Sequence, residues 1–347
     1  MNGNLNNNLN ILELPSDLYS RNLIISEGIK KYKNEKGLKQ IRILDIGGRK
    51  GMLDLFLDKE DELTLLDIRE GEEKNLRVGD ATNMYFYEDN SFEVITSGDV
   101  FEHIPEAQRD KFVKETLRVT NGLVSLAAPF SVNQNEHLEE IANSYFKYLT
   151  GEDHEWIIEH INNGLPEVED LGTIISRLKV YFNVCESNNV DNWMLLQLLT
   201  FYLFKFKINS KKIGQFYRFY NEHIGEVEDE NANFYRKIYF ITKNGKFDYK
   251  FTYKYKGLMK EKLLEKSFTI LADSSREFRE EFAAMNGHAK SQGEIINHLD
   301  RELKDARSTL QQHRETIIQK EALIMAMKSS IFWKMRSVLV RGAKKFR

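Results

Sequence analysis

Four aspartates stand at the ends of short apolar segments, where carboxylates could bind a polar ligand. In chain order they are Asp45, Asp67, Asp80 and Asp99. The carboxyl ends of parallel strands meet at one edge of a sheet, and a carboxylate there can accept hydrogen bonds from both hydroxyls of a ribose. A single aspartate at a strand end is more often a cap or turn residue. Four in succession instead indicate a site for a nucleotide-like ligand, with Asp67 on the ribose and Asp80 near an adenine amino group.

Three glycines, Gly47, Gly48 and Gly51, follow the first apolar segment. Glycine lets the backbone turn sharply and lets a ligand approach the main chain without meeting a Cβ. A helix over 52–57 would begin directly after them, and the first backbone N–H groups of a helix have no partner within it. We therefore expect a strand, a glycine turn and a helix that hold the same ligand.

The order of the apolar segments predicts how these residues are positioned. Between residues 16 and 245, short β-branched runs alternate with longer helical stretches, as in a parallel sheet covered by helices. The predicted fold class is α/β, a Rossmann-like sheet with helical insertions. Strands are expected at 41–46, 63–67, 92–97, 123–128, 179–184 and 235–242, and helices at 106–118, 136–171 and 192–221.

These motifs together resemble those of the class I S-adenosylmethionine-dependent methyltransferases. The resemblance covers residues 40–130, with a looser fit to 245, and rests on the glycine motif, on Gly79-Asp80-Ala81 and on Asp99–Pro105. It implies a methyltransferase domain over 16–245 with S-adenosylmethionine as cofactor. The residues implied to bind it are Asp45, Gly47, Gly48, Gly51, Asp67, Asp80, Ala81 and Asp99. One position departs, because Arg49 stands where the family usually has its middle glycine.

Methyl transfer to a hydroxyl needs a group that removes the hydroxyl proton. Substrate-binding elements follow the later strands in this fold, which makes His154, Glu155 and His160 the predicted catalytic or acceptor-binding residues, with His137 as a further candidate. The alternative is that the histidines serve packing, and His103 is given mainly a local structural role. No metal is expected, because His154 and His160 are not spaced i, i+4 on one helix face.

Asn244-Gly245 predicts a two-residue hairpin that leads into an extended segment. Five aromatic residues alternate along that segment: Phe247, Tyr249, Phe251, Tyr253 and Tyr255. We expect this aromatic face to pack on the core, with stacking on a sugar or on single-stranded nucleic acid as the alternatives. Residues 246–277 are otherwise predicted to be an extended linker.

Apolar residues recur every seven positions in the C-terminal part of the chain. They are Phe282, Ala289, Ile296, Leu303, Leu310, Ile317, Ile324 and Ile331. The second apolar position of each heptad is weaker and includes Gln292 and Lys320. The pattern predicts a coiled coil over 278–328 through which the chain forms a homo-oligomer, the alternative being a lone helix packed on the domain.

The last part of the chain is basic, with seven Lys or Arg and no acid from Ala322 to Arg347, although the whole chain has a net charge of −3. An acidic body with a basic tail is not typical of a nucleic-acid binder, so no nucleic-acid partner is expected. As a helix, 329–347 would carry an apolar face bordered by basic side chains. This pattern predicts binding to an anionic membrane surface, with docking on a partner protein as the alternative.

The composition of 347 residues, 41% hydrophobic and 30% charged, indicates a folded protein and excludes fibrous and wholly disordered classes. Its one cysteine, Cys185, excludes an intramolecular disulfide and a zinc site built on several cysteines. Residues 1–15 are predicted to be disordered and contain no signal peptide, and no stretch of about 18 apolar residues follows. These features favour a cytoplasmic protein.

Two short segments, 156–166 and 330–336, resemble blocks in methyltransferases and other proteins of bacterial surface-polysaccharide clusters. The resemblance implies an O-methyltransferase that acts on a glycan or glycolipid acceptor and can cap the chain. Together with the basic tail, it predicts a protein that lies peripherally on the inner face of the plasma membrane. Two alternatives stay open at this point. One is a methyltransferase of a small lipid or metabolite, and the other is an inactive scaffold that binds the cofactor within a glycan-assembly complex.

Overall fold

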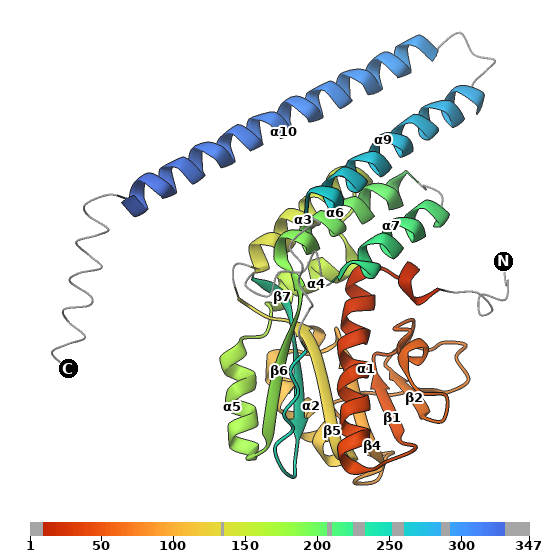
Figure 1. Ribbon diagram of the computed structural model, residues 1–347, viewed down its shortest axis with the longest axis vertical. Helices are drawn as coiled ribbons and strands as arrows, with labels where there is room; N and C mark the ends of the chain where they lie inside the picture. The colour runs from red at the N-terminus through yellow and green to blue at the C-terminus, as the bar shows by residue number, and fades with distance from the viewer. Residues whose placement is uncertain are drawn as a thin grey trace. The chain divides into compact units, whose positions relative to one another are not determined.

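The computed structural model describes residues 10–132, 135–206, 210–224, 233–251, 260–285 and 292–329. The chain divides into two compact units, Met1–Phe278 and Arg279–Arg347, and each is described by itself. The first unit contains the sheet and its covering helices (Figure 1). The second contains the end of one helix and a further long helix.

Seven strands form one sheet in the order β3-β2-β1-β4-β5-β7-β6. Their bounds are β1 Arg42–Ile46, β2 Glu62–Asp67, β3 Leu76–Val78, β4 Phe92–Gly98, β5 Thr120–Pro129, β6 Tyr181–Asn189 and β7 Phe234–Thr242. β7 is antiparallel to both of its neighbours, and the pairs from β3 to β5 are parallel. The predicted α/β class and the predicted strands are confirmed. The chain moves outward from β1 to β3 and returns at β4, so the β1–β4 boundary is a topological switch point, where ligands bind in such sheets.

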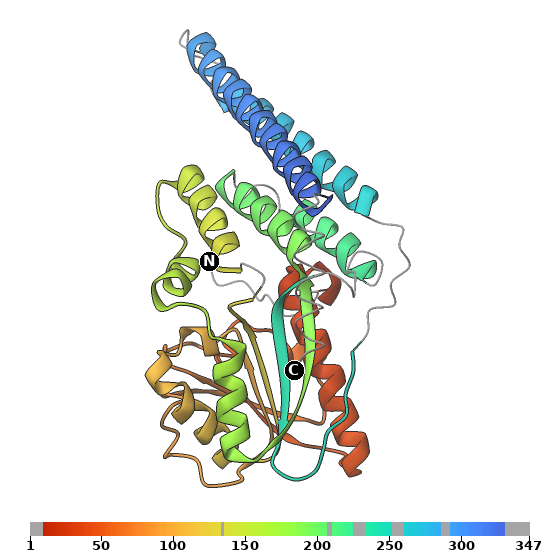
Figure 2. The same cartoon turned by 90° about the vertical axis from the view of Figure 1, so that its left-hand side faces the viewer.

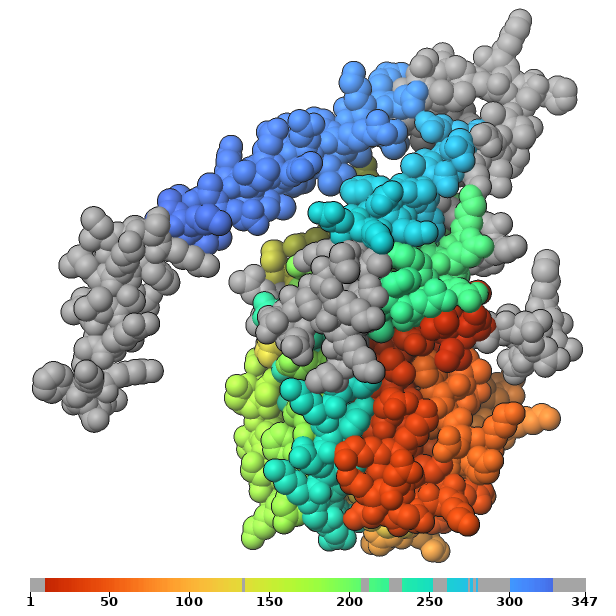
Figure 3. Space-filling view, in the orientation of Figure 1, coloured from red at the N-terminus to blue at the C-terminus, as the bar shows by residue number. Residues whose placement is uncertain are grey.

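Helices cover both faces of the sheet. The α-helices of the first unit begin with α1 Ser16–Lys36, α2 Glu106–Val119, α3 Asn135–Thr150 and α4 Glu155–Asn163, and continue with α5 Val168–Leu178, α6 Val190–Lys205 and α7 Ser210–Glu222. On one face α1 packs Ile24, Ile25 and Ile29 against the sheet, and Figure 3 shows this side. On the other face α2 and α5 cover the sheet (Figure 2), and their apolar residues form a second cluster with it. The helices expected within 106–118, 136–171 and 192–221 are confirmed.

The helix predicted over 52–57 is wrong, because the glycine turn leads into a single 3-10 turn, η2 Leu53–Phe56. Gly47, Lys50 and Met52 all have positive φ angles, and this backbone cannot start an α-helix. Gly47 has no room for a side chain, since a Cβ there would lie 2.2 Å from Val100 Cγ2. The turn is fixed instead from α1, where the Asn22 side chain donates a hydrogen bond to the Gly51 carbonyl at 2.7 Å.

The segment after β7 differs from its predicted form. Phe247 and Tyr249 are buried in the core and Phe251 packs against it, which confirms the packing interpretation for these three rings. They do not form a second hairpin strand. Tyr253 and Tyr255 lie outside the described residues, and α9 Lys260–Met285 occupies part of the predicted linker 246–277. Leu263 and Ile270 of α9 are buried, so the first half of this helix belongs to the folded domain.

At the N-terminus the structure differs from the predicted disorder over residues 1–15. Residues 10–15 are ordered, with the 3-10 turn η1 Ile11–Glu13, because Asn221 donates hydrogen bonds to the carbonyls of Leu12 and Leu14. Residues 1–9 and 330–347 lie outside the described residues. None of the helices that the structure describes is long and apolar enough to cross a bilayer.

In the second unit the heptad segment is divided between the end of α9 and α10 Gln292–Ser329, with 286–291 not described. The helix is confirmed, but the coiled coil stays a prediction. Four heptad positions can be assessed, and Leu303, Leu310, Ile317 and Ile324 are all exposed, by 39–71%. Their row of side chains is therefore available for pairing between chains.

Candidate active site

A cavity of about 580 Å³ lies at the carboxyl ends of the central strands. Its volume is within the range of small-molecule and cofactor sites. Residues from the glycine turn, from the ends of β2, β3 and β4, from α4 and from β7 line it. Seven of the predicted site residues are among them: Gly47, Asp67, Asp80, Ala81, Asp99, His154 and His160.

Four predicted site residues do not line this cavity. Asp45 is buried beneath the glycine turn, where it accepts a hydrogen bond from Thr96 Oγ1 at 2.6 Å, and burial raises its pKa to about 6. A Cβ at Gly48 would lie 2.3 Å from Asp45 Oδ2, and Gly51 is held by α1. Asp45, Gly48 and Gly51 therefore stabilise the glycine turn without lining the cavity. Glu155 is exposed and pairs with Arg69, so the structure does not bring it to the cavity.

Arg49, which departs from the expected glycine pattern, does line the cavity. Its Nε lies 3.4 Å from Glu73 Oε2, and its guanidinium fills the space beside Gly71. Arg49 therefore reaches toward the loop that follows β2. The carboxylate of Glu73 holds it at that wall of the cavity.

Two of the predicted acids have locally fixed side chains. Asp67 Oδ1 accepts a hydrogen bond from the Arg69 backbone N–H at 2.8 Å, and Asp80 Oδ1 accepts one from the Thr82 N–H at 2.7 Å. Each of these turns aims a carboxylate at the cavity edge. Both acids have the place and the acceptor atoms that the ribose and adenine roles require.

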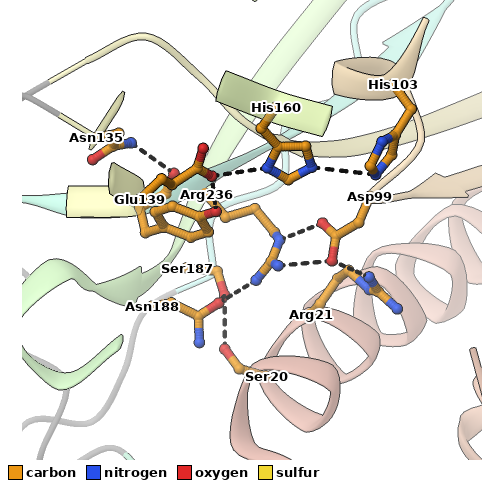
Figure 4. A network of polar contacts seen from close by, with 11 residues as sticks. Ser20, Arg21, Asp99, His103, Asn135, Glu139, His160, Ser187, Asn188 and Arg236 are labelled. Atoms are coloured by element: carbon orange, nitrogen blue, oxygen red, sulfur yellow. Dashed lines mark hydrogen bonds and ion pairs between the residues drawn. The ribbon is translucent and has the colours of Figure 1, made fainter. Parts of the chain in front are cut away.

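Asp99 forms the centre of a buried charge network that the sequence did not indicate (Figure 4). Arg236 of β7 donates two hydrogen bonds to its carboxylate, both at 2.7 Å, and Arg21 of α1 pairs with it as well. Burial would raise the pKa of Asp99, but the two guanidinium groups outweigh that effect and lower the pKa to about 2. Asp99 is therefore a permanent anion, and its first role is to hold α1 and β7 together.

A chain of histidines and carboxylates lies beside this network (Figure 4). His160 Nδ1 lies 2.9 Å from Glu139 Oε1, and His160 Nε2 lies 3.2 Å from His103 Nε2. The other nitrogen of His103 lies 3.1 Å from Glu159 Oε2. Burial would lower the pKa of His160, but Glu139 raises it above its ordinary value, whereas burial and His160 lower that of His103. The structure thus places the predicted residue His160 beside His103, for which the sequence analysis expected mainly a local structural role.

Glu102 is the most unusual side chain at the cavity. It is fully buried, and neither of its carboxyl oxygens has a hydrogen-bond partner among the residues that the structure describes. Burial, followed by the charge of Asp99, raises its pKa to about 8. A buried polar atom without a partner costs free energy, so this arrangement calls for a ligand or a functional reason.

His154 has a structural role that the sequence did not show. It is the N-cap of α4, and its Nδ1 accepts a hydrogen bond from the Ile157 N–H. A neutral imidazole that accepts at Nδ1 carries its proton at Nε2. His154 can therefore donate a hydrogen bond into the cavity, but it cannot accept a proton at Nε2. His137 is exposed on α3, pairs with Glu140, and does not line the cavity.

Three aromatic side chains form walls of the cavity. The rings of Trp193 and Tyr235 stack at 3.9 Å, and the Tyr235 hydroxyl donates to Glu139. Trp156, partly exposed, contacts the Arg69 guanidinium at 4.6 Å. Sequence analysis did not assign these three rings to the site. For Tyr235 the sequence offered one indirect signal, because two basic residues, Arg236 and Lys237, follow it in an otherwise apolar strand.

The sheet order, the switch-point cavity and the acids at the strand ends define an α/β nucleotide-cofactor domain. A family model described as a methyltransferase domain matches residues 44–124. The chain therefore contains a methyltransferase domain of the class that uses S-adenosylmethionine. This confirms the predicted type of enzyme and cofactor.

Several solved structures that are similar to this chain are methyltransferases. They include the plantazolicin methyltransferase BamL (13% identity, TM-score 0.42, 65% of this chain and 85% of that chain). An S-adenosylmethionine-dependent methyltransferase from Archaeoglobus fulgidus is 15% identical (TM-score 0.39, 65% and 95%). A putative sarcosine dimethylglycine methyltransferase from Galdieria sulphuraria is 15% identical (TM-score 0.40, 64% and 86%). No curated protein matches this sequence.

Proposed function

We propose that this protein is an S-adenosylmethionine-dependent O-methyltransferase that methylates a hydroxyl of a cell-surface glycan or glycolipid and can thereby cap it. The observation that carries the proposal is the single cavity with two different ends. Asp67 and Asp80 follow β2 and β3, whereas His103 and Tyr235 belong to the β4 and β7 side of the sheet, so acids suited to a nucleoside and histidines with aromatic rings line different parts of the cavity.

The first end fits S-adenosylmethionine. Gly47 lets the ligand approach the backbone, Asp67 offers its carboxylate to the ribose hydroxyls, and Asp80 with Ala81 borders the adenine position. The bound cofactor supplies a methyl group already activated for transfer. The protein then has to orient the acceptor and remove its proton.

The second end fits a sugar. Trp156, Trp193 and Tyr235 line the cavity with aromatic surface of the kind that packs against a sugar, and Trp156 is the most exposed of the three. Nearby, His103 and His160 offer nitrogen atoms that can activate a hydroxyl, while His154 can donate a hydrogen bond to the acceptor. This revises the catalytic assignment made from sequence, because His103 replaces Glu155 beside His160.

Transfer of an isotopically labelled methyl group tests this function directly. The full chain is incubated with labelled S-adenosylmethionine and with lipid-linked or free bacterial glycans, and the products are separated by mass. Label on a sugar hydroxyl supports the proposal. Label found only on a small lipid or metabolite would show that the acceptor is not a glycan. Cofactor binding without any methyl transfer would favour an inactive scaffold protein.

Asp67→Ala should weaken S-adenosylmethionine binding by about 10- to 150-fold, because hydrogen bonds to a charged acceptor contribute about 1.5–3 kcal/mol. Calorimetric titration measures this without an acceptor. Asp67→Asn should lie in between, since it keeps an oxygen for the Arg69 N–H but loses the charge. Glu62→Ala, at the far end of the same strand, is the matched control and should bind like the wild type.

We also propose that α10 forms a homo-oligomer and that residues 329–347 attach it to an anionic membrane. The exposed Leu303, Leu310, Ile317 and Ile324 support the first part, and the basic composition of the tail supports the second. The protein would then work as a peripheral enzyme on the inner face of the plasma membrane. In that position it would meet a lipid-linked acceptor.

Two shortened chains should separate these properties. A chain that ends at Lys328 should stay oligomeric but lose binding to anionic vesicles, because it keeps the heptads and lacks the basic tail. A chain that ends at Phe278 should be a monomer that still binds the cofactor, since it keeps the core residues Leu263 and Ile270. Light scattering and vesicle sedimentation measure both. Sedimentation of the first shortened chain with anionic vesicles would show that the tail is not the anchor.

A further inference from the structure

Three side chains at the cavity form a cluster with the donor types of a metal site. Glu102 and His103 belong to the turn η3 Phe101–His103 after β4, and His160 comes from α4. One ligand atom from each of them lies within 4.8 Å of the other two. All three line the cavity. Any ion bound there would therefore be accessible from the proposed acceptor end.

The distance between the two imidazoles suits a shared ion. His103 Nε2 and His160 Nε2 lie 3.2 Å apart. Two nitrogens bound at about 2.1 Å to one tetrahedral or octahedral ion are separated by about 3.0–3.4 Å. The same distance also suits a hydrogen bond between the rings, as Figure 4 draws it. The surroundings of the two rings therefore have to distinguish these roles.

Both rings have a carboxylate at the nitrogen that faces away from the cluster. Glu139 Oε1 lies 2.9 Å from His160 Nδ1, and Glu159 Oε2 lies 3.1 Å from His103 Nδ1. A histidine that binds a metal almost always has its other nitrogen paired with a carboxylate, carbonyl or water, which fixes the ring and its tautomer. Here Glu139 fixes the His160 ring by a hydrogen bond and Glu159 lies within ion-pair distance of the His103 ring, with Nε2 of each ring on the side of the cluster.

Glu102 supplies the second, independent observation. Its side chain is fully buried, and neither carboxyl oxygen has a hydrogen-bond partner among the residues that the structure describes. The two arginines of the neighbouring network, Arg21 and Arg236, are paired with Asp99. A divalent cation bound in the cluster would give the Glu102 carboxylate its missing partner.

We propose that Glu102, His103 and His160 bind a divalent transition-metal ion whose remaining coordination positions face the cavity. Two imidazoles and one carboxylate suit Zn²⁺, Mn²⁺, Fe²⁺ or Co²⁺ and not Mg²⁺ or Ca²⁺, which prefer oxygen ligands. The catalytic consequence rests on the proposed O-methyltransferase function. A sugar hydroxyl coordinated to the ion loses its proton to water more readily, because the ion lowers the hydroxyl pKa. The expectation that no metal binds considered only the spacing of His154 and His160, whereas this site draws its ligands from two elements.

The test uses the full chain without a histidine tag, stripped of metal by a chelator. Titration with Mn²⁺ followed by electron paramagnetic resonance, and with Co²⁺ followed by visible absorption, should each show one site per chain. His103→Gln, His160→Gln and Glu102→Gln should each weaken that site at least 100-fold. Glu139→Gln, which changes only the partner of His160, should weaken it about 10- to 100-fold. His137→Gln is the matched control, since His137 also has a carboxylate neighbour but does not line the cavity, and it should not change the site.

Circular dichroism and S-adenosylmethionine titration of every variant show whether it is folded. Absence of Mn²⁺ and Co²⁺ binding in the folded wild-type protein overturns the proposal. Equal binding by a folded His103→Gln, His160→Gln or Glu102→Gln variant also overturns it, because the ion would then be bound elsewhere. Metal binding without methyl transfer would support the metal site and contradict the proposed enzyme function. Failure of the metal proposal can therefore be told apart from failure of the proposed function.

Discussion

Replacing Arg236 with methionine should lower the free energy of unfolding by about 3–5 kcal/mol. The Arg236 side chain is buried and donates two parallel hydrogen bonds to Asp99. Its removal leaves the carboxylate with Arg21 as its only ionic partner among the residues that the structure describes, and it leaves Asn188 without its donor from β7. Urea denaturation followed by circular dichroism measures the change.

The matched control is the next residue of the same strand. Lys237→Met removes a pair with the surface residue Glu186 and should change stability by less than about 1 kcal/mol. Arg236→Lys should fall between the two, because lysine keeps the charge but cannot make the two parallel bonds. A loss below 1 kcal/mol for Arg236→Met would show that Arg21 alone is sufficient to hold Asp99.

The difference in unfolding free energy between the wild type and Arg236→Met should also depend on pH. The pKa of Asp99 is about 2 in the folded protein, below its ordinary value of 3.8. A lowered folded-state pKa stabilises the protein above the unfolded-state value, and the contribution is lost as the pH falls through the folded-state value. The stability difference between the wild type and Arg236→Met should therefore be constant near neutral pH and should shrink between about pH 4 and pH 2.

The sheet was predictable because its strands are short, apolar and β-branched, and because the acids follow directly after them. Asp67, Asp80 and Asp99 reach one cavity for the geometric reason that parallel strands end at one edge. The helix over 52–57 failed because its apolar residues fit a single turn equally well. Composition alone did not reveal the left-handed backbone at Lys50 and Met52.

The charge network could not be predicted, since its members are distant in the sequence. Arg21 and Arg236 meet Asp99 from 78 and 137 residues away. The helix α1 gives a weak signal because it buries polar side chains, among them Ser20, Asn22 and Ser26, beside its isoleucines. Such positions are stabilised by partners on other elements, which no local pattern describes.

Of the two histidines that meet at the cavity, only His160 was predicted as a site residue, and the reason is related. Spacing rules test whether two ligands share one helix face, and by that rule His154 and His160 are no pair. His103 and His160 are 57 residues apart and meet only because η3 lies against α4. The residue that local reasoning favoured, His154, is instead the one that its own helix uses as a cap.

His103→Ala should therefore lower the rate of methyl transfer by about 10²–10⁴-fold and should change S-adenosylmethionine affinity by less than about threefold. The reason is that His103 lines the cavity beside His160 and acts on the acceptor hydroxyl, as a base when no ion is bound and as a ligand of the proposed ion when one is, whereas Asp67 and Asp80 follow other strands. Single-turnover transfer of labelled methyl to the glycan acceptor gives the rate, and calorimetry gives the affinity.

His154→Asn is the decisive comparison for this assignment. Asparagine is a good N-cap residue, so the variant should keep α4 intact. Because the cap places the His154 proton on Nε2, loss of this ring removes a hydrogen-bond donor but no base, and the rate should fall by less than about tenfold. If His154→Asn slows transfer as much as His103→Ala does, the acceptor proton leaves through His154, and the cap must open during each turnover.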